Sequence, residues 1–229
     1  VNQTNQPPAN PQVSGWHMDS DALWLDSEVD WGKPPPELNS HSRVEWDATA
    51  WRDVRFRRRL LWLEEVLIDL STVENPHRQQ LDWTLHLAAQ ALDQSGTPQP
   101  FSLSGPLRHM TNATMAPLNG CQPRHFARDG DTVALWLSGD GELWQGVAPD
   151  NPATHDLSYL VIRSHLPQAR FVCLWDFANS APLTEVQVNH TPVGTQITFW
   201  RGERVTHVTL YDAPGKRPDA IFPFAESGT

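Results

Sequence analysis

Long apolar runs and basic residues are both scarce in this sequence of 229 residues. No stretch approaches the roughly 20 apolar residues that a membrane-spanning helix needs, so we expect no membrane partner. Only 17 Lys and Arg stand against 27 Asp and Glu, which gives a formal net charge of −10. A general nucleic-acid binder would carry a basic surface, so we expect no nucleic-acid partner. The same charge disfavours a broad surface for acidic polysaccharides, and any anion site must be local.

Cysteine is scarce as well, with only Cys121 and Cys173. Their spacing excludes a zinc knuckle, and we predict no metal site in this chain. The two residues either pair or act as small buried hydrophobes, and the sequence leaves both readings open. Ser-His-Asp motifs, phosphate-binding loops and Gly-rich dinucleotide turns are also absent, so no common catalytic motif guides the assignment.

Tryptophan, proline and glycine are abundant, with 11, 20 and 13 residues. The spread of Pro and Gly along the chain predicts many turns and short elements. Most Trp side chains are expected in the core, because aromatic residues bury large areas. An exposed Trp face would instead suit the apolar face of a sugar ring.

Apolar and polar residues alternate with a period of two in many short segments, which is typical of β-strands. Turn signals separate these segments every eight to twelve residues, a spacing typical of a sandwich. We therefore predict an all-β fold, a large antiparallel β-sandwich that forms one domain. The strongest candidate strands cover residues 80–87, 132–137, 142–146, 158–163, 169–175, 183–188, 196–200 and 204–211.

Composition divides the chain into three parts. Residues 1–42 are polar and rich in proline, and we expect an irregular segment with short edge strands of the same domain. Residues 43–212 hold the predicted sandwich. Residues 213–229 are weakly patterned and are expected to trail from the domain as a tail.

Residues 51–73 have two readings. Leu60, Leu63, Leu67 and their neighbours fit a helical stripe, but the segment also fits two strands joined at Glu64 and Glu65. The surrounding strands favour the hairpin. In that hairpin three arginines share one face and either form a basic stripe for an acidic sugar or pair with nearby acids. We favour the pairing of Arg55, Arg57 and Arg59 with Glu64, Glu65 and Asp69.

Several segments together resemble the heparinase II/III-like polysaccharide lyases, in the C-terminal β-sandwich portion of that family. They are RRRLLWLEEVLID at 57–69, QLDWTLH at 80–86 and RFVCLWDF at 170–177. The start, VNQTNQ at 1–6, looks like the segment that follows a family His-Asn-Thr motif. The resemblance extends in order over residues 1–212.

This resemblance implies a multilayered sandwich that packs against an upstream α/α-toroid and a protein that is secreted or periplasmic. Such enzymes cleave uronic-acid polysaccharides by β-elimination, so an acidic polysaccharide is the expected partner. The family's catalytic residues, and the residues that hold a metal in some full-length members, precede the segments matched here. We therefore expect no catalytic residue and no cofactor in this chain, which would support the cleft rather than catalyse.

Four residues are candidates for substrate binding. Trp83 and His86 lie in one predicted strand with opposite parity, and so face opposite sides of it. A hydrogen-bonded core histidine is the more common role for a residue like His86. Arg124 and His125 lie in loop-rich sequence, where an arginine can clamp a carboxylate but is more often simply solvated.

Two other functions stay open, a non-catalytic carbohydrate-binding module and a structural or interaction domain. If the domain forms one wall of a lyase cleft, we expect a large apolar face that is exposed in the absence of the upstream partner. A binding module predicts two or three coplanar exposed Trp, and a structural domain predicts neither feature. The only tyrosines, Tyr159 and Tyr211, lie in apolar strands, where packing is favoured over a role as a base.

Overall fold

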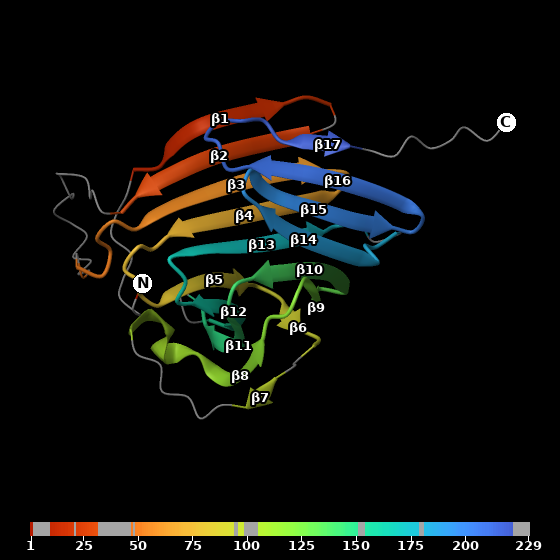
Figure 1. Ribbon diagram of the computed structural model, residues 1–229. Helices are drawn as coiled ribbons and strands as arrows, with labels where there is room; N and C mark the ends of the chain where they lie inside the picture. Colours follow the sequence, from red (N-terminus) through yellow and green to blue (C-terminus); the bar gives the residue numbers. More distant parts are fainter. Residues whose placement is uncertain are drawn as a thin grey trace.

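The computed structural model of the chain consists almost entirely of antiparallel β-strands in three sheets (Figure 1). This confirms the predicted all-β sandwich. In the described part of the chain the one helical element is a short 3-10 turn, η1 (Gly105–His109). The structure describes residues 1, 10–20, 22–31, 47, 49–93, 96–98, 105–150, 154–178 and 181–221.

The three sheets differ in width, and we call them sheets A, B and C. Sheet A has eight strands, in the order β1 (Gln12–Met18), β2 (Ala22–Asp30), β3 (Arg55–Leu63), β4 (Val66–Glu74), β13 (Gln168–Asp176), β10 (Asp131–Gly139), β9 (Gln122–Arg128) and β6 (Gln90–Ala91). Sheet B has five, in the order β5 (Leu81–Leu87), β12 (Asp156–Ser164), β11 (Glu142–Pro149), β8 (Thr111–Pro117) and β7 (Thr97–Pro98). Sheet C has four, in the order β14 (Glu185–Thr191), β15 (Gly194–Arg201), β16 (Arg204–Tyr211) and β17 (Asp219–Ile221).

Sheet A is the middle layer, with sheets B and C on its two faces. Its strand β13 shows why: Phe171 and Cys173 join the core shared with sheet B, whereas Val172 and Leu174 join the core shared with sheet C. A strand that is buried on both faces reads as a continuous apolar run. The molecule is therefore a three-layered sandwich.

The β3–β4 hairpin resolves the ambiguity between helix and strand in favour of strands. Its two turn residues, Glu64 and Glu65, have φ of 47° and 62°. Two positive φ values are what the tight two-residue turn of a right-twisted hairpin needs, although Asn-Gly is the usual choice. The backbone carbonyl of Glu65 accepts a hydrogen bond from the N–H of Phe177 (3.0 Å), which anchors the turn to the end of β13.

The chain ends are more regular than the sequence indicated. Strand β2 pairs with β1 on one side and with β3 on the other, so it is an interior strand, while β1 pairs with β2 alone among the described strands. After residue 213, Gly215 donates its N–H to Asp26 (2.8 Å) and β17 pairs with β16. The expected irregular start and trailing tail are corrected to this extent. Residues 32–46 and 222–229 lie outside the described residues, and the domain boundaries stay a prediction.

The arginines of β3 form ion pairs, but not with the predicted partners. Strand β2 supplies acids opposite them, because Asp26 faces Arg59 and Asp30 faces Arg55 in the register. Arg57 donates through Nε to Asp26 (2.8 Å), which is almost fully buried. The remaining ion pairs join Arg55 to Asp30 and Glu74, Arg58 to Asp69, and Arg59 to Asp212. The arginines are thus paired as expected, but Glu64, Glu65 and Asp69 were the wrong partners, in part because β2, which supplies Asp26 and Asp30, was not recognised as a neighbouring strand.

The two cysteines are free thiols. Burial raises the pKa of Cys121 to about 12, and burial together with Asp69 raises that of Cys173 well above its usual value. Both therefore stay protonated, and they behave as small hydrophobes rather than as a disulfide.

Candidate functional site: a corner cleft beside strand β5

The uneven widths of sheets A and B create a corner. We call the face of sheet A that packs on sheet B the cleft face. In the middle of β13 and on β10 this face is covered, since Phe171, Leu135 and Leu137 have no exposed surface, whereas Trp175 near the end of β13 is partly buried. On β2 and β3 the same face leaves Leu23 42% and Trp62 39% exposed. Sheet B thus covers only part of sheet A, and its edge strand β5 stands as a wall above the remaining floor.

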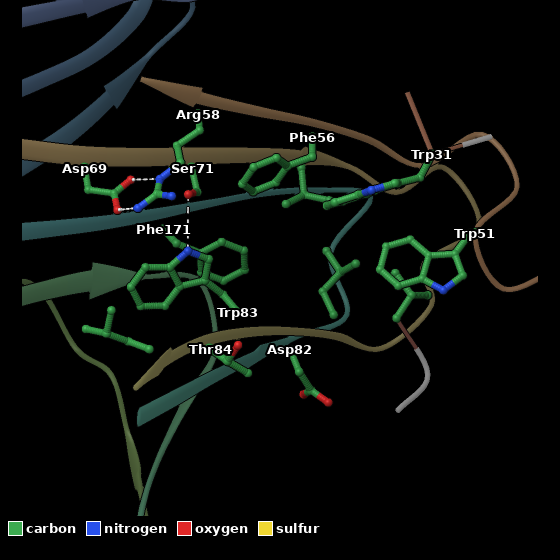
Figure 2. Close-up of a pocket in the computed structure, with 14 residues that line it drawn as sticks. Trp31, Trp51, Phe56, Arg58, Asp69, Ser71, Asp82, Trp83, Thr84 and Phe171 are labelled. Carbon is green, nitrogen blue, oxygen red and sulfur yellow. Dashed lines mark hydrogen bonds and ion pairs between the residues drawn. The ribbon is translucent and has the colours of Figure 1, made fainter. Parts of the chain in front are cut away.

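A cleft of about 350 Å³ lies in this corner, and Figure 2 shows the residues around it. Five aromatic side chains line it: Trp31 and Trp51 before β3, Phe56 on β3, Trp83 on β5 and Phe171 on β13. The rings of Trp31 and Trp51 meet edge to face with centroids 4.8 Å apart, and Trp31 lies 5.1 Å from Phe56. Such contacts fix the rings and give the cleft rigid apolar walls.

Trp83 reaches the cleft because it alternates inward on β5. Its ring stacks on Phe171 with centroids 6.0 Å apart and planes inclined by 16°. Its indole N–H donates to the hydroxyl of Ser71 on β4 (3.2 Å), so the ring is held from two sides (Figure 2). A ring locked in this way loses little entropy when a ligand stacks on it.

Arg58 and Asp69 form the charged part of the cleft. The guanidinium donates to the carboxylate side-on, through Nε to Oδ1 (3.0 Å) and through Nη2 to Oδ2 (2.6 Å). The Asp69 side chain is 3% exposed and the Arg58 side chain 48%. The hydrogen bond to Asp69 raises the pKa of Arg58, so the group is a permanent cation. Its third nitrogen, Nη1, makes no hydrogen bond with any described residue, and Arg58 is one of the residues that line the cleft (Figure 2).

The chemical groups of the cleft suit binding better than acid–base catalysis. Its second carboxylate, Asp82, is held by Arg163 through two hydrogen bonds of 2.7 and 3.2 Å. Both carboxylates are therefore committed to arginines, and the described lining holds no His or Tyr. Within the part of the chain that the structure describes, no three His, Cys, Asp or Glu side chains gather in a way that could hold a metal ion.

Of the four predicted binding residues, the structure brings only Trp83 into the cleft. His86 points from the opposite face of β5, as its parity requires, and its ring stacks on Tyr159 with centroids 3.9 Å apart. Burial lowers the pKa of His86, while Asp150 partly opposes this shift. His86 is therefore neither a core histidine nor a neighbour of Trp83.

Arg124 and His125 lie in strand β9 rather than in a loop, which corrects that expectation. Strands β13 and β10 separate β9 from β4, so neither residue borders the cleft. Arg124 is buried and donates to the carbonyl of Pro123 (2.8 Å), and burial lowers its pKa. His125 contacts Asp93 on the opposite face of the strand (Nδ1 to Oδ2, 2.6 Å).

The sequence reading missed Trp31, Trp51, Arg58 and Asp69. One signal was available, because Arg58 places a charge on the otherwise apolar side of its strand. A charge at such a position needs a buried partner or an opening to solvent. Here it has both, in Asp69 and the cleft.

Comparisons with known proteins add little. No protein-family model matches the chain, and no curated protein matches it. Among solved structures, one described as a heparinase III gene product is similar with a TM-score of 0.46 and 8% sequence identity. That match covers 88% of this chain, which spans 27% of the length of that protein. No helix in the described part is long and apolar enough to cross a membrane.

Proposed function

We propose that this chain is the non-catalytic β-sandwich part of a polysaccharide lyase and that its corner cleft binds a uronic-acid-containing polysaccharide. The lyase assignment rests on the sequence resemblance of residues 57–69, 80–86 and 170–177. In this proposal the catalytic residues belong to an upstream α/α-toroid, and the whole protein acts outside the cell or in the periplasm.

One observation carries the binding proposal, the placement of Arg58 between aromatic walls. Asp69 occupies the Nε–Nη2 edge of the guanidinium and leaves the Nη1–Nη2 edge for a ligand. A planar carboxylate matches such an edge in bidentate geometry, and Trp83 offers a fixed aromatic face for the attached sugar ring. A single local cation also reconciles an acidic ligand with a chain of net charge −10.

The same cleft explains why we assign no chemistry to it. β-Elimination requires a neutralised uronate carboxylate, a base for the C5 proton and an acid for the leaving oxygen. Arg58 meets the first requirement, the neutralisation of the uronate carboxylate. Asp69 and Asp82 are both paired to arginines, and the described side chains that line the cleft include no His or Tyr, so in this proposal the base and the acid come from the upstream part.

Calorimetric titration of the chain with uronate oligosaccharides tests the binding role. Arg58→Ala removes a charge-assisted hydrogen bond worth roughly 1.5–3 kcal/mol, so we expect the affinity to fall by about tenfold or more. Trp83→Ala is expected to weaken uronate and neutral oligosaccharides alike. The control is Arg128→Ala, which removes an exposed arginine outside the cleft. Equal affinities for Arg58→Ala and Arg128→Ala contradict the proposal.

A lyase assay tests the division of labour. The ultraviolet absorbance of the new C4–C5 double bond is followed for the chain alone and for the chain mixed with the polypeptide encoded upstream of it. Activity only in the mixture supports a binding wall for an upstream catalyst. Activity of the chain alone overturns the non-catalytic assignment, and binding without activity in either sample favours a carbohydrate-binding module.

A further inference from the structure

Strand β1 is an unprotected edge of sheet A. Among the described strands it pairs with β2 alone, and Figure 1 shows it at the outer border of the sheet. An edge strand presents a row of unpaired N–H and C=O groups that can pair with another chain, and natural edges are commonly shielded by charged residues, by proline or by a short length. Strand β1 has seven residues, QVSGWHM, with no Lys, Arg, Asp, Glu or Pro among them.

The apolar side chains of this strand are unusually exposed. Val13 is 58% exposed, Trp16 69% and Met18 67%. All three lie opposite alternate residues of β2 and therefore belong to the cleft face, and the bulge between Val13 and Gly15 supplies the extra residue that keeps Val13 on this side. An edge that is apolar and lacks charge attracts a partner strand.

The opposite face of β1 is held by its own chain. A Cβ added to Gly15 would lie 3.0 Å from Cα of Gly215, and one added to Gly215 would lie 2.6 Å from the carbonyl oxygen of Ser14. Arg217, two residues further on, pairs with Asp19 just after the strand (2.9 Å). The segment after β16 thus fixes β1 from the side of sheet C and leaves its apolar side for a partner.

Charge favours a second copy of this chain as that partner. The net charge is −10, so two copies repel each other over most of their surface. Strand β1 is neutral apart from His17, and the acid that follows it, Asp19, is paired with both His17 and Arg217. Two copies therefore approach through β1 with little repulsion, whereas a strongly charged partner finds no complementary charge on this strand.

The exposed area suffices for a weak dimer. A Trp side chain can bury up to roughly 250 Å², so the 69% exposure of Trp16 leaves about 170 Å² per copy. Val13, Met18 and the edge backbone of the seven residues raise this toward the roughly 600 Å² per copy that small specific interfaces bury. An interface of that size is consistent with a dissociation constant in the micromolar range.

We propose that the chain forms a symmetric dimer in which β1 pairs antiparallel with β1 of a second copy. The two-fold axis stands perpendicular to the sheet, so the same patch of each copy meets its equivalent. The two eight-stranded sheets join into one, and Trp16 of each copy packs beside the apolar face of the other. Both corner clefts then open on the same side of the dimer. The interface uses no residue of the cleft, so the dimer does not depend on the proposed function.

Sedimentation velocity tests the dimer. Between about 1 µM and about 300 µM the chain should pass from monomer to dimer. Trp16→Lys and Met18→Lys each place a charge in the contact, and we expect each to raise the dissociation constant at least about tenfold. Trp16→Leu keeps an apolar side chain and should retain most of the affinity. Val193→Lys is the matched control, because Val193 is 58% exposed in the turn between β14 and β15 and the added charge is the same.

Hydrogen exchange locates the contact. The backbone amides of residues 12–18 should exchange more slowly at a concentration where the dimer forms than at one where it dissociates, because pairing gives them new acceptors. The amides of the edge strand β14 serve as the internal control and should exchange at the same rate in both samples.

Three results overturn the proposal: a monomer at the highest concentration, a dimer that Trp16→Lys weakens no more than Val193→Lys does, and a dimer without slower exchange in β1. A monomeric chain that binds the upstream polypeptide, and loses that binding in Trp16→Lys, also overturns it, because β1 then belongs to that partner. Arg58→Ala should leave the dimer intact, and Trp16→Lys should leave the affinity for uronate oligosaccharides intact. The dimer and the sugar site can therefore fail separately.

Discussion

Asp26 offers the sharpest test of how the layers hold together. Its carboxylate is 1% exposed and accepts hydrogen bonds from Nε of Arg57 (2.8 Å) and from the N–H of Gly215 (2.8 Å). It thus joins β2 and β3 of sheet A to the segment that connects β16 with β17. Asp26→Asn keeps the shape of the side chain and removes its charge.

The expected cost follows from the burial of both partners. The Arg57 side chain is 11% exposed, and removing one member of a buried ion pair typically costs 3–5 kcal/mol. Arg57 retains the carbonyls of Asp212 and Ala213 as acceptors, so we expect the lower end, about 3 kcal/mol. With a urea m-value of about 3 kcal/mol/M, the midpoint of unfolding should fall by about 1 M at pH 7.

The pH dependence of stability tests whether the charge of Asp26 causes this loss. Burial raises the pKa of Asp26, but the hydrogen bonds from Arg57 and Gly215 and the charge of Arg57 outweigh it, and the net shift is downward. A carboxyl whose folded pKa lies below its unfolded pKa stabilises the fold fully above the unfolded value. That contribution is lost as the pH falls through the folded pKa. The difference in the urea midpoint of unfolding between the native chain and Asp26→Asn should therefore become smaller below about pH 4.

Asp129→Asn is the matched control, because its ion pair with Arg128 is exposed and such pairs contribute about 0–1 kcal/mol. Equal midpoints for Asp26→Asn and Asp129→Asn at pH 7 would refute the argument that the buried pair fastens the layers.

Two further predictions concern residues outside the cleft. Because burial lowers the pKa of His86, the unfolded chain takes up a proton first as the pH falls below about 6.5, and stability falls with it. His86→Gln should reduce the drop in melting temperature between pH 7.5 and 5.5. Part of the drop should remain, because burial also lowers the pKa of His190. An unchanged drop in His86→Gln contradicts the prediction. Glu65 has a positive φ, so Glu65→Gly should raise the free energy of unfolding by about 1 kcal/mol in urea titrations. A loss of stability would show that the Glu65 side chain has a stabilising contact.

The sequence predicted those parts of the fold whose signal is local. Period-two alternation located β14, β15 and β16 of sheet C and the buried strands of sheets A and B, because the alternation of apolar and polar residues within a strand marks its two faces, whereas β17 was missed. The β3–β4 hairpin was ambiguous in isolation, since Leu60, Leu63 and Leu67 fit both periods. Pairing with β2 and β13 on either side decides it, and pairing is not a local property.

The site was harder to predict because the cleft is made by tertiary contacts. Trp83 was correctly singled out, and parity correctly separated it from His86. Arg124 attracted attention as a basic residue in loop-rich sequence, yet it lies in β9 with its charge directed at its own neighbours. In the sequence Arg58 is only a charge within an apolar pattern, and its role depends on Asp69, eleven residues away across the hairpin.

The position of the corner cleft follows from the different widths of two packed sheets. Sheet B ends at β5, while sheet A continues through β4 and β3 to β1. Where two sheets end together, the inner face of each is buried, and a strand alternates apolar and polar residues. Where one sheet runs on, its inward-facing residues become a floor that must meet solvent or a ligand. Trp62 and Arg58 both stand on that floor, so their exposure is a consequence of topology.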